Sequence, residues 1–284
     1  MTTKSIPIPT MVDSHKIEIL SNFIKSISSG VGRKPKLSVN QLFEFIRIKK
    51  DYDVGDWKKT FNLCKEIHPD WVLPVYHNCL SSLYRLFVYL NLLVNTILLV
   101  NRQQFLNQNM KVVFIDSTCI PVCHILRSSR HKTMLRLAEY SKSTMGWYYG
   151  IKLHCIMDYQ NNPIYFTFTN AKTDDRQVLK QALSDKKLFY DTNTMFVADK
   201  GYQAKWLEEL AKETQNYLIT GKRKSKTTNT LASWFDMHLL HNRARIETIF
   251  SKLKTNYNLT STKARSEFGY FFNTIFALFS LLTS

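Results

Sequence analysis

The stretch Lys111-Val112-Val113-Phe114-Ile115-Asp116 is a continuous apolar run that ends in an acid. A short apolar run of this kind is typical of a strand that is buried on both faces. Thr194-Met195-Phe196-Val197-Ala198 repeats the pattern and is followed by a second acid, Asp199. The two runs predict two strands of one sheet, each ending at a carboxylate.

The segments around these runs alternate between strand and helix patterns. We expect further strands over residues 150–157, 164–169 and 216–220, with Asn161-Asn162-Pro163 as the turn between the first two. Helical spacing of apolar residues covers residues 175–183, 203–213 and 241–254. This order predicts an α/β layered domain with a mixed sheet.

The first hundred residues have a helical pattern instead. Ser38 is a plausible N-cap for a helix over residues 39–50, and further helices are expected over residues 57–66 and 76–100. A helix-turn-helix and a plain helical bundle both fit this pattern. We therefore expect a helical N-terminal region, residues 1–105, followed by an α/β domain, residues 106–284.

Charge is the strongest compositional signal. The 284 residues include 39 Lys and Arg against 22 Asp and Glu, a net charge of +17, while 44% hydrophobic content indicates a folded chain. An excess this large predicts a polyanionic partner, usually nucleic acid. The basic residues are densest over residues 220–265, which include Lys222, Arg223 and Lys224.

Cysteine usage and apolar stretches bear on the compartment. Five cysteines with long gaps fit reduced thiols in a cytosolic chain. The first twenty residues lack the apolar core of a signal peptide. The apolar stretches 86–100 and 268–284 are shorter than the roughly 20 residues of a membrane span. We expect two buried core helices and a soluble protein without a membrane partner.

Three acids are the candidate catalytic residues. Asp116 and Asp199 follow strands, where sites of α/β sheets assemble, although either alone could simply cap a turn. On the helix over residues 241–254, Glu247 falls within about 40° of Arg243 and Lys254. A surface salt bridge would equally explain Arg243 and Glu247. Together, the three carboxylates suit two Mg²⁺ or Mn²⁺ ions acting on a phosphodiester, with Arg243 and Lys254 on DNA phosphates.

Other candidates carry less weight. Cys119, Cys123 and His124 suggest zinc, but no second ligand pair follows at finger spacing. His124, Arg130 and His131, near Asp116, either contact DNA or are ordinary loop residues. The aromatic residues 147–149 are either core residues or a base-stacking platform.

Several motifs occur in a fixed order: Ile115-Asp116-Ser117-Thr118, Ser143-Thr144-Met145-Gly146-Trp147-x-x-Gly150-x-Lys152-Leu153-His154, Asp174-Asp175-Arg176, Asp199-Lys200-Gly201-Tyr202, and Arg243-x-x-Ile246-Glu247-Thr248. Together they resemble the DDE transposases of bacterial insertion sequences, closest to the group numbered nine hundred and eighty-two. The resemblance covers about residues 30–284 and is strongest from Phe114 onward.

The resemblance implies a ribonuclease-H-like catalytic domain and a triad of Asp116, Asp199 and Glu247 that holds two metal ions. It also implies cleavage and joining of double-stranded DNA, at the inverted repeats of the element and at a target, by a homodimer. Arg243 and Lys254 match a Tyr-Arg-Glu-Lys signature whose tyrosine position is Leu240 here.

The expected division of labour follows. Transposon-end recognition is assigned to residues 1–105, and phosphate contacts are expected from Lys200, Arg243, Lys254 and the run Lys222, Arg223, Lys224. The expected location is the bacterial cytoplasm, at the nucleoid. A structure-selective nuclease and a catalytically idle DNA-binding protein remain the alternatives; the intact triad argues against the second.

Overall fold

The computed structural model describes residues 11–27, 36–143, 146–190, 192–221, 234–260 and 263–284. It divides into two compact units, Met1–Asn95 with Lys263–Ser284, and Thr96–Thr262. We expected one boundary, after residue 105; the first unit here ends at Asn95 and also includes the C-terminal segment. Each unit is described by itself.

The helical unit contains α1 (Met11–Ile27), α2 (Val39–Asp51), α3 (Trp57–Ile67), the first part of α4 (Tyr76–Leu106), and α9 (Glu267–Leu282). The predicted N-cap is confirmed: the Ser38 side chain accepts a hydrogen bond from the Gln41 backbone, and the Gln41 side chain accepts one from the Ser38 backbone. Asp56 caps α3 in a similar way through the Lys58 backbone amide.

Aromatic side chains explain why α9 belongs to this unit. Phe272 of α9 meets Trp57 edge-on with ring centroids 5.3 Å apart, and Phe276 meets Phe43 at 5.7 Å. Such edge-to-face pairs add to the stability that apolar burial provides. Phe272, Leu278 and Phe279 are buried, as the sequence predicted for a core helix at the C-terminal end.

Helix α4 differs from the expected short core helix. It has 31 residues and is, among the described helices, the one long and apolar enough to span a membrane by length and composition. Leu86 and Leu90 are buried on one side, whereas Val88, Leu92 and Leu99 are exposed. The prediction of a buried helix over residues 86–100 is therefore correct for only one of its faces.

The second unit is built on a six-stranded mixed sheet. Its strands are β1 (Val112–Cys123), β2 (Glu139–Ser143), β3 (Gly146–Asp158), β4 (Pro163–Asn170), β5 (Met195–Ala198) and β6 (Tyr217–Thr220). The order is β2-β3-β1-β5-β6, and β4 also pairs with β3. Strand β1 runs antiparallel to β3 and parallel to β5, and β5 runs parallel to β6. The mixed sheet that the sequence predicted is confirmed.

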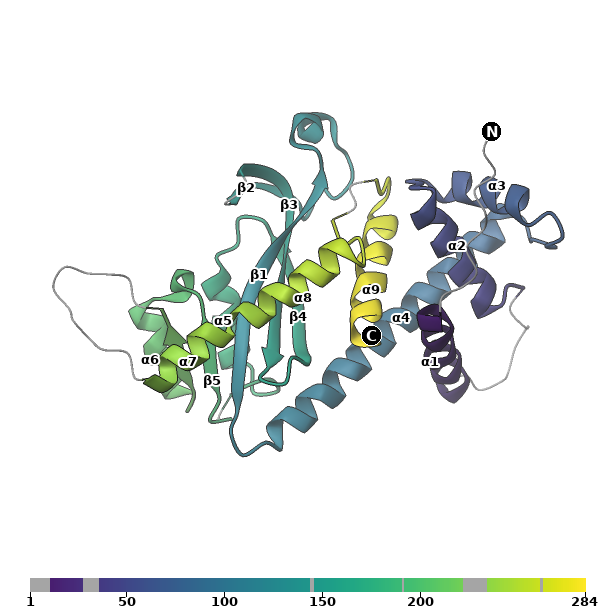
Figure 1. Ribbon diagram of the computed structural model, residues 1–284. Helices are drawn as coiled ribbons and strands as arrows, with labels where there is room; N and C mark the ends of the chain where they lie inside the picture. The colour runs from purple at the N-terminus through teal and green to yellow at the C-terminus, as the bar shows by residue number, and fades with distance from the viewer. Residues whose placement is uncertain (1–10, 28–35, 144–145, 191, 222–233, 261–262) are drawn as a thin grey trace. The chain divides into compact units, whose positions relative to one another are not determined.

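Helices cover the sheet. The helices α5 (Asp175–Ser184) and α6 (Lys205–Glu213) contribute to one hydrophobic core with alternate residues of β1, namely Val113 and Ile115. Because side chains alternate along a strand, Asp116 belongs to the other face of β1. There it meets α8 (Ala244–Thr255), which lies against β1 and is preceded in the chain by α7 (Trp234–Asn242) (Figure 1). The helix expected over residues 241–254 is confirmed as α8, which begins at Ala244, whereas α7 was not predicted.

Candidate active site

Asp116 and Asp199 follow the paired segments of two parallel strands. The pairing of β1 with β5 joins Val112–Phe114 to Met195–Val197, so both acids lie just beyond it. β1 itself continues to Cys123, and Asp116 is opposite Cys155 of β3. The position of Asp116 is therefore the end of the β5 pairing and not, as predicted, the end of the strand.

The amide of the next residue donates a hydrogen bond to each carboxylate. One oxygen of Asp116 accepts a hydrogen bond of 2.8 Å from the Ser117 amide. Asp199 is the N-cap of the short 3₁₀ helix Lys200–Tyr202 and accepts a hydrogen bond of 2.7 Å from the Lys200 amide. The turn-capping interpretation of Asp199 is therefore correct, and it also fixes the direction of that carboxylate.

Arg243 brings the three predicted acids together. Its Nη1 lies 3.3 Å from Oδ2 of Asp116, and its Nη2 lies 3.1 Å from Oε1 of Glu247 and 4.0 Å from Oδ1 of Asp199. Arg243 is the N-cap residue of α8 and Glu247 lies in the first turn, so the two are one helical turn apart. The acids come from three separate segments of the chain, and one guanidinium contacts all three.

Burial sets the electrostatics of the first acid. Loss of solvent raises the pKa of Asp116 to about 6, against the opposing effects of the Ser117 amide and the Arg243 guanidinium. The negative charges of Asp199 and Asp175 raise it further. The side chains of Asp199 and Glu247 are 57% and 59% exposed, so their contacts with Arg243 are screened by water. Asp116 is therefore the acid whose charge is most strongly controlled by the fold.

Within the described residues, no three acid, imidazole or thiol side chains are placed to hold one metal ion together. The three carboxylates are instead arranged around the guanidinium of Arg243.

The other basic residues that the sequence predicted lie at several different positions, unlike Arg243, which contacts the three acids. Lys200 adjoins Asp199, and its side chain lies against Gly221, where an added Cβ would be 3.1 Å from Lys200 Cγ. Lys254 is seven residues beyond Glu247, or about 10 Å along the helix axis, and so lies outside the contacts of Arg243. Lys222, Arg223 and Lys224 lie outside the described residues.

The cysteines are free thiols, as expected. Cys123 and Cys155 are buried, and loss of solvent raises the pKa of each thiol. Among the described residues no three possible metal ligands gather around Cys119, Cys123 and His124, so the zinc interpretation gains no support.

A second polar cluster, which the sequence did not predict, lies beside Asp116. Lys152 Nζ donates hydrogen bonds to Asp175 Oδ1 at 2.8 Å and to the Thr173 carbonyl at 2.9 Å. Ser117 Oγ donates to Asp175 Oδ2 at 2.9 Å. The Ser117 amide in turn contacts Asp116. The cluster therefore links Asp175 to the backbone that orients the first acid.

His154 borders the same cluster without charge. It is fully buried, its Nε2 is 2.8 Å from Thr169 Oγ1, and its Nδ1 is 4.0 Å from Asp175 Oδ1. Burial lowers the pKa of His154 to about 4, although the Asp175 charge acts in the opposite direction. Three of the quoted motifs thus meet here, but their spacing in sequence gave no indication of this contact.

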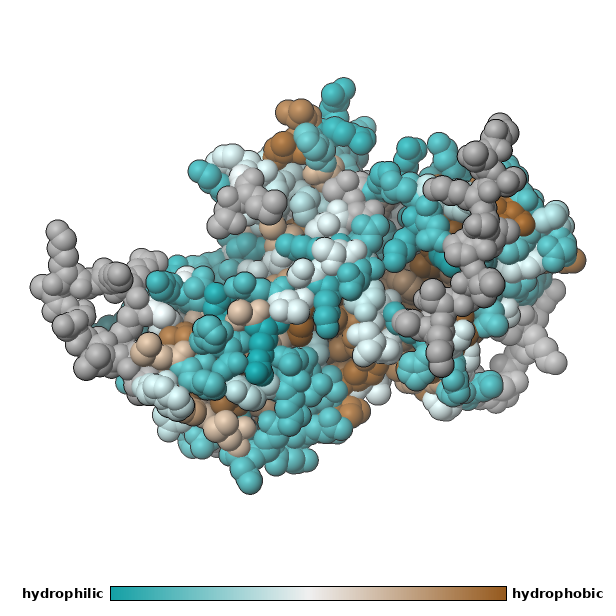
Figure 2. Space-filling model, viewed as in Figure 1, coloured by the Kyte–Doolittle hydropathy of each residue, from teal (hydrophilic) through white to brown (hydrophobic). Residues whose placement is uncertain are grey.

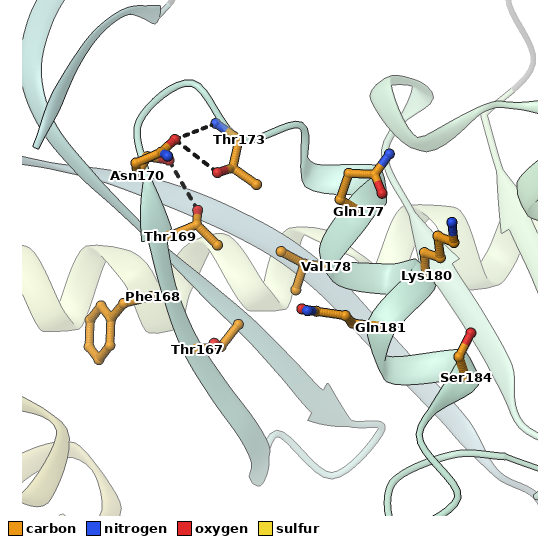
Figure 3. Close-up of a pocket in the computed structure, with 10 residues that line it drawn as sticks. All are labelled: Thr167, Phe168, Thr169, Asn170, Thr173, Gln177, Val178, Lys180, Gln181 and Ser184. Atoms are coloured by element: carbon orange, nitrogen blue, oxygen red, sulfur yellow. Dashed lines mark hydrogen bonds between the residues drawn. The ribbon is translucent and has the colours of Figure 1, made fainter. Parts of the chain in front are cut away.

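A polar groove lies between β4 and α5, and none of the three acids lines it. It has a volume of about 570 Å³, and its lining includes Thr169, Thr173 and Gln181. Figure 3 shows Asn170 at one end, where its side-chain oxygen accepts hydrogen bonds from the backbone and hydroxyl of Thr173. Since none of the acids around Arg243 lines this groove, we place the candidate active site at Arg243.

The fold defines the class of the domain: β1, β3 and β4 are antiparallel, β5 and β6 are added in parallel, and helices cover both faces, which is a ribonuclease-H-like arrangement. Residues 106–267 match the family model described as the transposase DDE domain. The chain belongs to this family and is a transposase, a DNA-binding protein of transposition.

No curated protein matches the sequence. Among solved structures, the chain is similar to one described as the crystal structure of a pre-cleavage Mos1 transpososome, with 11% identity over 99% of this chain and 81% of that one. The TM-score of 0.22 is too low to establish a common overall arrangement.

Proposed function

We propose that the protein is the transposase of an insertion sequence of the group numbered nine hundred and eighty-two, and that it cleaves and joins DNA strands at the inverted repeats. Asp116, Asp199 and Glu247 form its catalytic triad. The observation that carries this proposal is the set of contacts from Arg243 to all three acids. Binding of DNA phosphate alone would need cations and gives no reason to gather three carboxylates.

The donor set fits divalent metal. Three carboxylates are hard oxygen ligands of the kind that Mg²⁺ and Mn²⁺ prefer, and the contacts of Arg243 show that this spot already holds positive charge close to all three. Asp116, Asp199 and Glu247 would hold the ions, two in the reaction we envisage. Bound there, they would supply activation of a water or 3′-hydroxyl and charge stabilisation at the leaving oxygen.

The chain's own residues have distinct roles in this proposal. Arg243 offsets the repulsion between the acids, and its guanidinium is a strong ligand for the phosphate next to the cleaved bond. Lys200 and Lys254 contact phosphates on either side of the triad. Lys222, Arg223 and Lys224 extend these contacts through charge alone.

End recognition is proposed for the helices within residues 1–105, because a helix fits the major groove of DNA. Both ends of an element are joined in one reaction, so we propose that a homodimer acts on DNA. The reaction takes place in the bacterial cytoplasm, on DNA of the nucleoid.

A strand-transfer assay tests the function. Full-length protein, Mg²⁺ and a labelled duplex that carries one inverted repeat are incubated with a supercoiled target plasmid. We expect a cut at the end of the repeat and a labelled product joined to the plasmid. Cleavage without joined product would assign the protein to the structure-selective nucleases. Binding without either product would make it a catalytically idle DNA-binding protein.

A further inference from the structure

The segment between β1 and β2, residues 124–138, is a folded projection that we call the arm. It contains the 3₁₀ helix Ile125–Arg130, which contacts β3. The Ser128 hydroxyl accepts a hydrogen bond of 2.8 Å from Tyr140, and the Ala138 amide donates one of 2.8 Å to the Met134 carbonyl. Met134 and Ala138 are buried. The arm therefore holds its surface side chains on a defined backbone.

The surface of the arm combines cations with apolar side chains. Arg127, Arg130, Lys132 and Arg136 are all exposed, and residues 124–138 contain no acid. None of these four forms an ion pair with another described residue. Between them, Leu126, Leu135 and Leu137 are 79%, 62% and 44% exposed. In Figure 2 apolar and polar surface adjoin at this projection, at the top of the view.

The cations and leucines on the surface of the arm indicate the chemistry of its partner. The three exposed leucines favour a partner that removes them from water. Four cations in a segment that itself contains no acid favour an anionic partner, and they make two arms repel one another. Duplex DNA offers both complements, with phosphates along the backbone and apolar sugar and base surface in the grooves.

We propose that the arm binds duplex DNA beside the cleavage site, with its four cations on phosphates and Leu126 and Leu135 in a groove. This proposal rests on the transposase function proposed above. Strand β1 sets the distance from Asp116 to the base of the arm. Cys123, at that base, is seven residues beyond Asp116 on the same strand. At about 3.3 Å per residue, and with a register shift between Pro121 and Cys123, the separation is at most about 23 Å, which corresponds to roughly 7 base pairs of a duplex that runs along β1.

The test compares two full-length variants of equal charge. The arm variant carries Arg127→Ala, Arg130→Ala, Lys132→Ala and Arg136→Ala. The control carries four alanine replacements of exposed lysines of the same unit that the proposal leaves off DNA, at Lys172, Lys186, Lys187 and Lys212. Dissociation constants are measured on a duplex that carries one inverted repeat, over a series of salt concentrations.

We expect the log–log salt slope of the arm variant to fall by about 0.9 for each phosphate that it no longer binds, a total of roughly 2 to 4. Protection from hydroxyl radicals should disappear about 7 base pairs from the cut and remain elsewhere. An equal fall of slope in the control variant, or unchanged protection at that distance, would overturn the proposal.

A second variant, Leu126→Ser with Leu135→Ser, separates the apolar contact from charge. We expect DNA binding to weaken several-fold with an unchanged salt slope. If it instead changes only the oligomeric state in sedimentation, the leucines serve a protein interface and the proposal is wrong.

Cleavage distinguishes this proposal from the proposed function. The duplex for this test ends 4 base pairs from the cut on the side where the arm would bind. Wild type and arm variant should cleave it equally, because the arm has no DNA to contact there. An arm variant that is impaired on this short duplex would contradict the proposal. Absence of cleavage by wild type on every duplex would refute the transposase function. The binding measurements would still decide whether the arm binds DNA.

Discussion

Nη1 of Arg243 lies 3.3 Å from Oδ2 of Asp116, although the two residues are 127 positions apart in the sequence. The contact joins the N-terminus of α8 to the centre of the sheet. It also brings Glu247, one helical turn further on, to the same guanidinium. The charge of the first acid and the position of the last are therefore coupled through a single side chain.

Replacement of Arg243 should change the pH dependence of metal binding. The guanidinium favours the ionised form of Asp116, so Arg243→Ala should raise the pKa of this acid above its value of about 6. The pH at which Mn²⁺ binding is half developed, measured by electron paramagnetic resonance, should move upward. Lys252→Ala, an exposed cation on the same helix, is the control and should leave the midpoint in place. An unchanged midpoint in Arg243→Ala would show that the contact does not control the acid.

The raised pKa of Asp116 predicts a stability change with a definite sign. Its ordinary value is 3.8, so the folded chain holds the proton more tightly than the unfolded chain does. The resulting stabilisation is complete below pH 4 and is lost as the pH rises through about 6. Asp116→Asn has no charge to bury and should therefore be more stable than wild type above pH 6, by roughly 1–3 kcal/mol in the absence of divalent metal.

Urea denaturation between pH 4 and pH 8 measures this difference. The two unfolding free energies should diverge from pH 4 upward and reach a constant difference above pH 7. A variant that is less stable than wild type across the whole range would mean that the Arg243 contact outweighs the cost of burial.

Asp175 should stabilise the domain through Lys152 and Ser117. Asp175→Asn leaves the Lys152 ammonium without its carboxylate, and we expect a loss of about 1–3 kcal/mol in the free energy of unfolding. Asp185→Asn removes an exposed acid that accepts a hydrogen bond from the Lys187 backbone and serves as the control. A double-mutant cycle with Lys152→Met isolates the pair. A coupling energy near zero would show that the two groups act independently.

The basic run outside the described residues gives a prediction from charge alone. Reversal of Lys222, Arg223 and Lys224 to glutamate should weaken DNA binding and reduce the log–log salt slope by about 0.9 for each phosphate that the run no longer neutralises. Filter binding over a salt series measures both quantities. If the slope stays at the wild-type value, the run is a solvated charge cluster.

The sequence was most informative where local chemistry decides structure. The apolar runs that end at Asp116 and Asp199 correctly placed two strands of one sheet, and Ser38 correctly marked a helix start. The strand Glu139–Ser143 could not be found, because an edge strand of mostly half-exposed polar residues has no apolar alternation. Helix α7 was also missed, since Leu239 is its buried residue and no apolar stripe marks it.

Contacts between segments that are far apart in the chain could not be predicted from the local sequence pattern. Packing of Phe272 on Trp57 places α9 with the N-terminal helices, which no boundary drawn along the chain could express. A fragment of residues 106–284 would expose this apolar face, so end recognition is better tested in the full chain. The sequence singled out three acids on separate segments, but the role of Arg243 as their common partner required the structure.

The most direct test of the proposed triad is cleavage of a labelled inverted-repeat duplex by Asp116→Asn, Asp199→Asn and Glu247→Gln, with binding measured in parallel. Glu213→Gln, an exposed acid on α6, is the matched control. We predict that each triad variant loses cleavage in Mg²⁺ and still binds the duplex with near wild-type affinity, while the control retains both activities. Near wild-type cleavage by any one of the three would remove that residue from the triad and contradict the proposed mechanism.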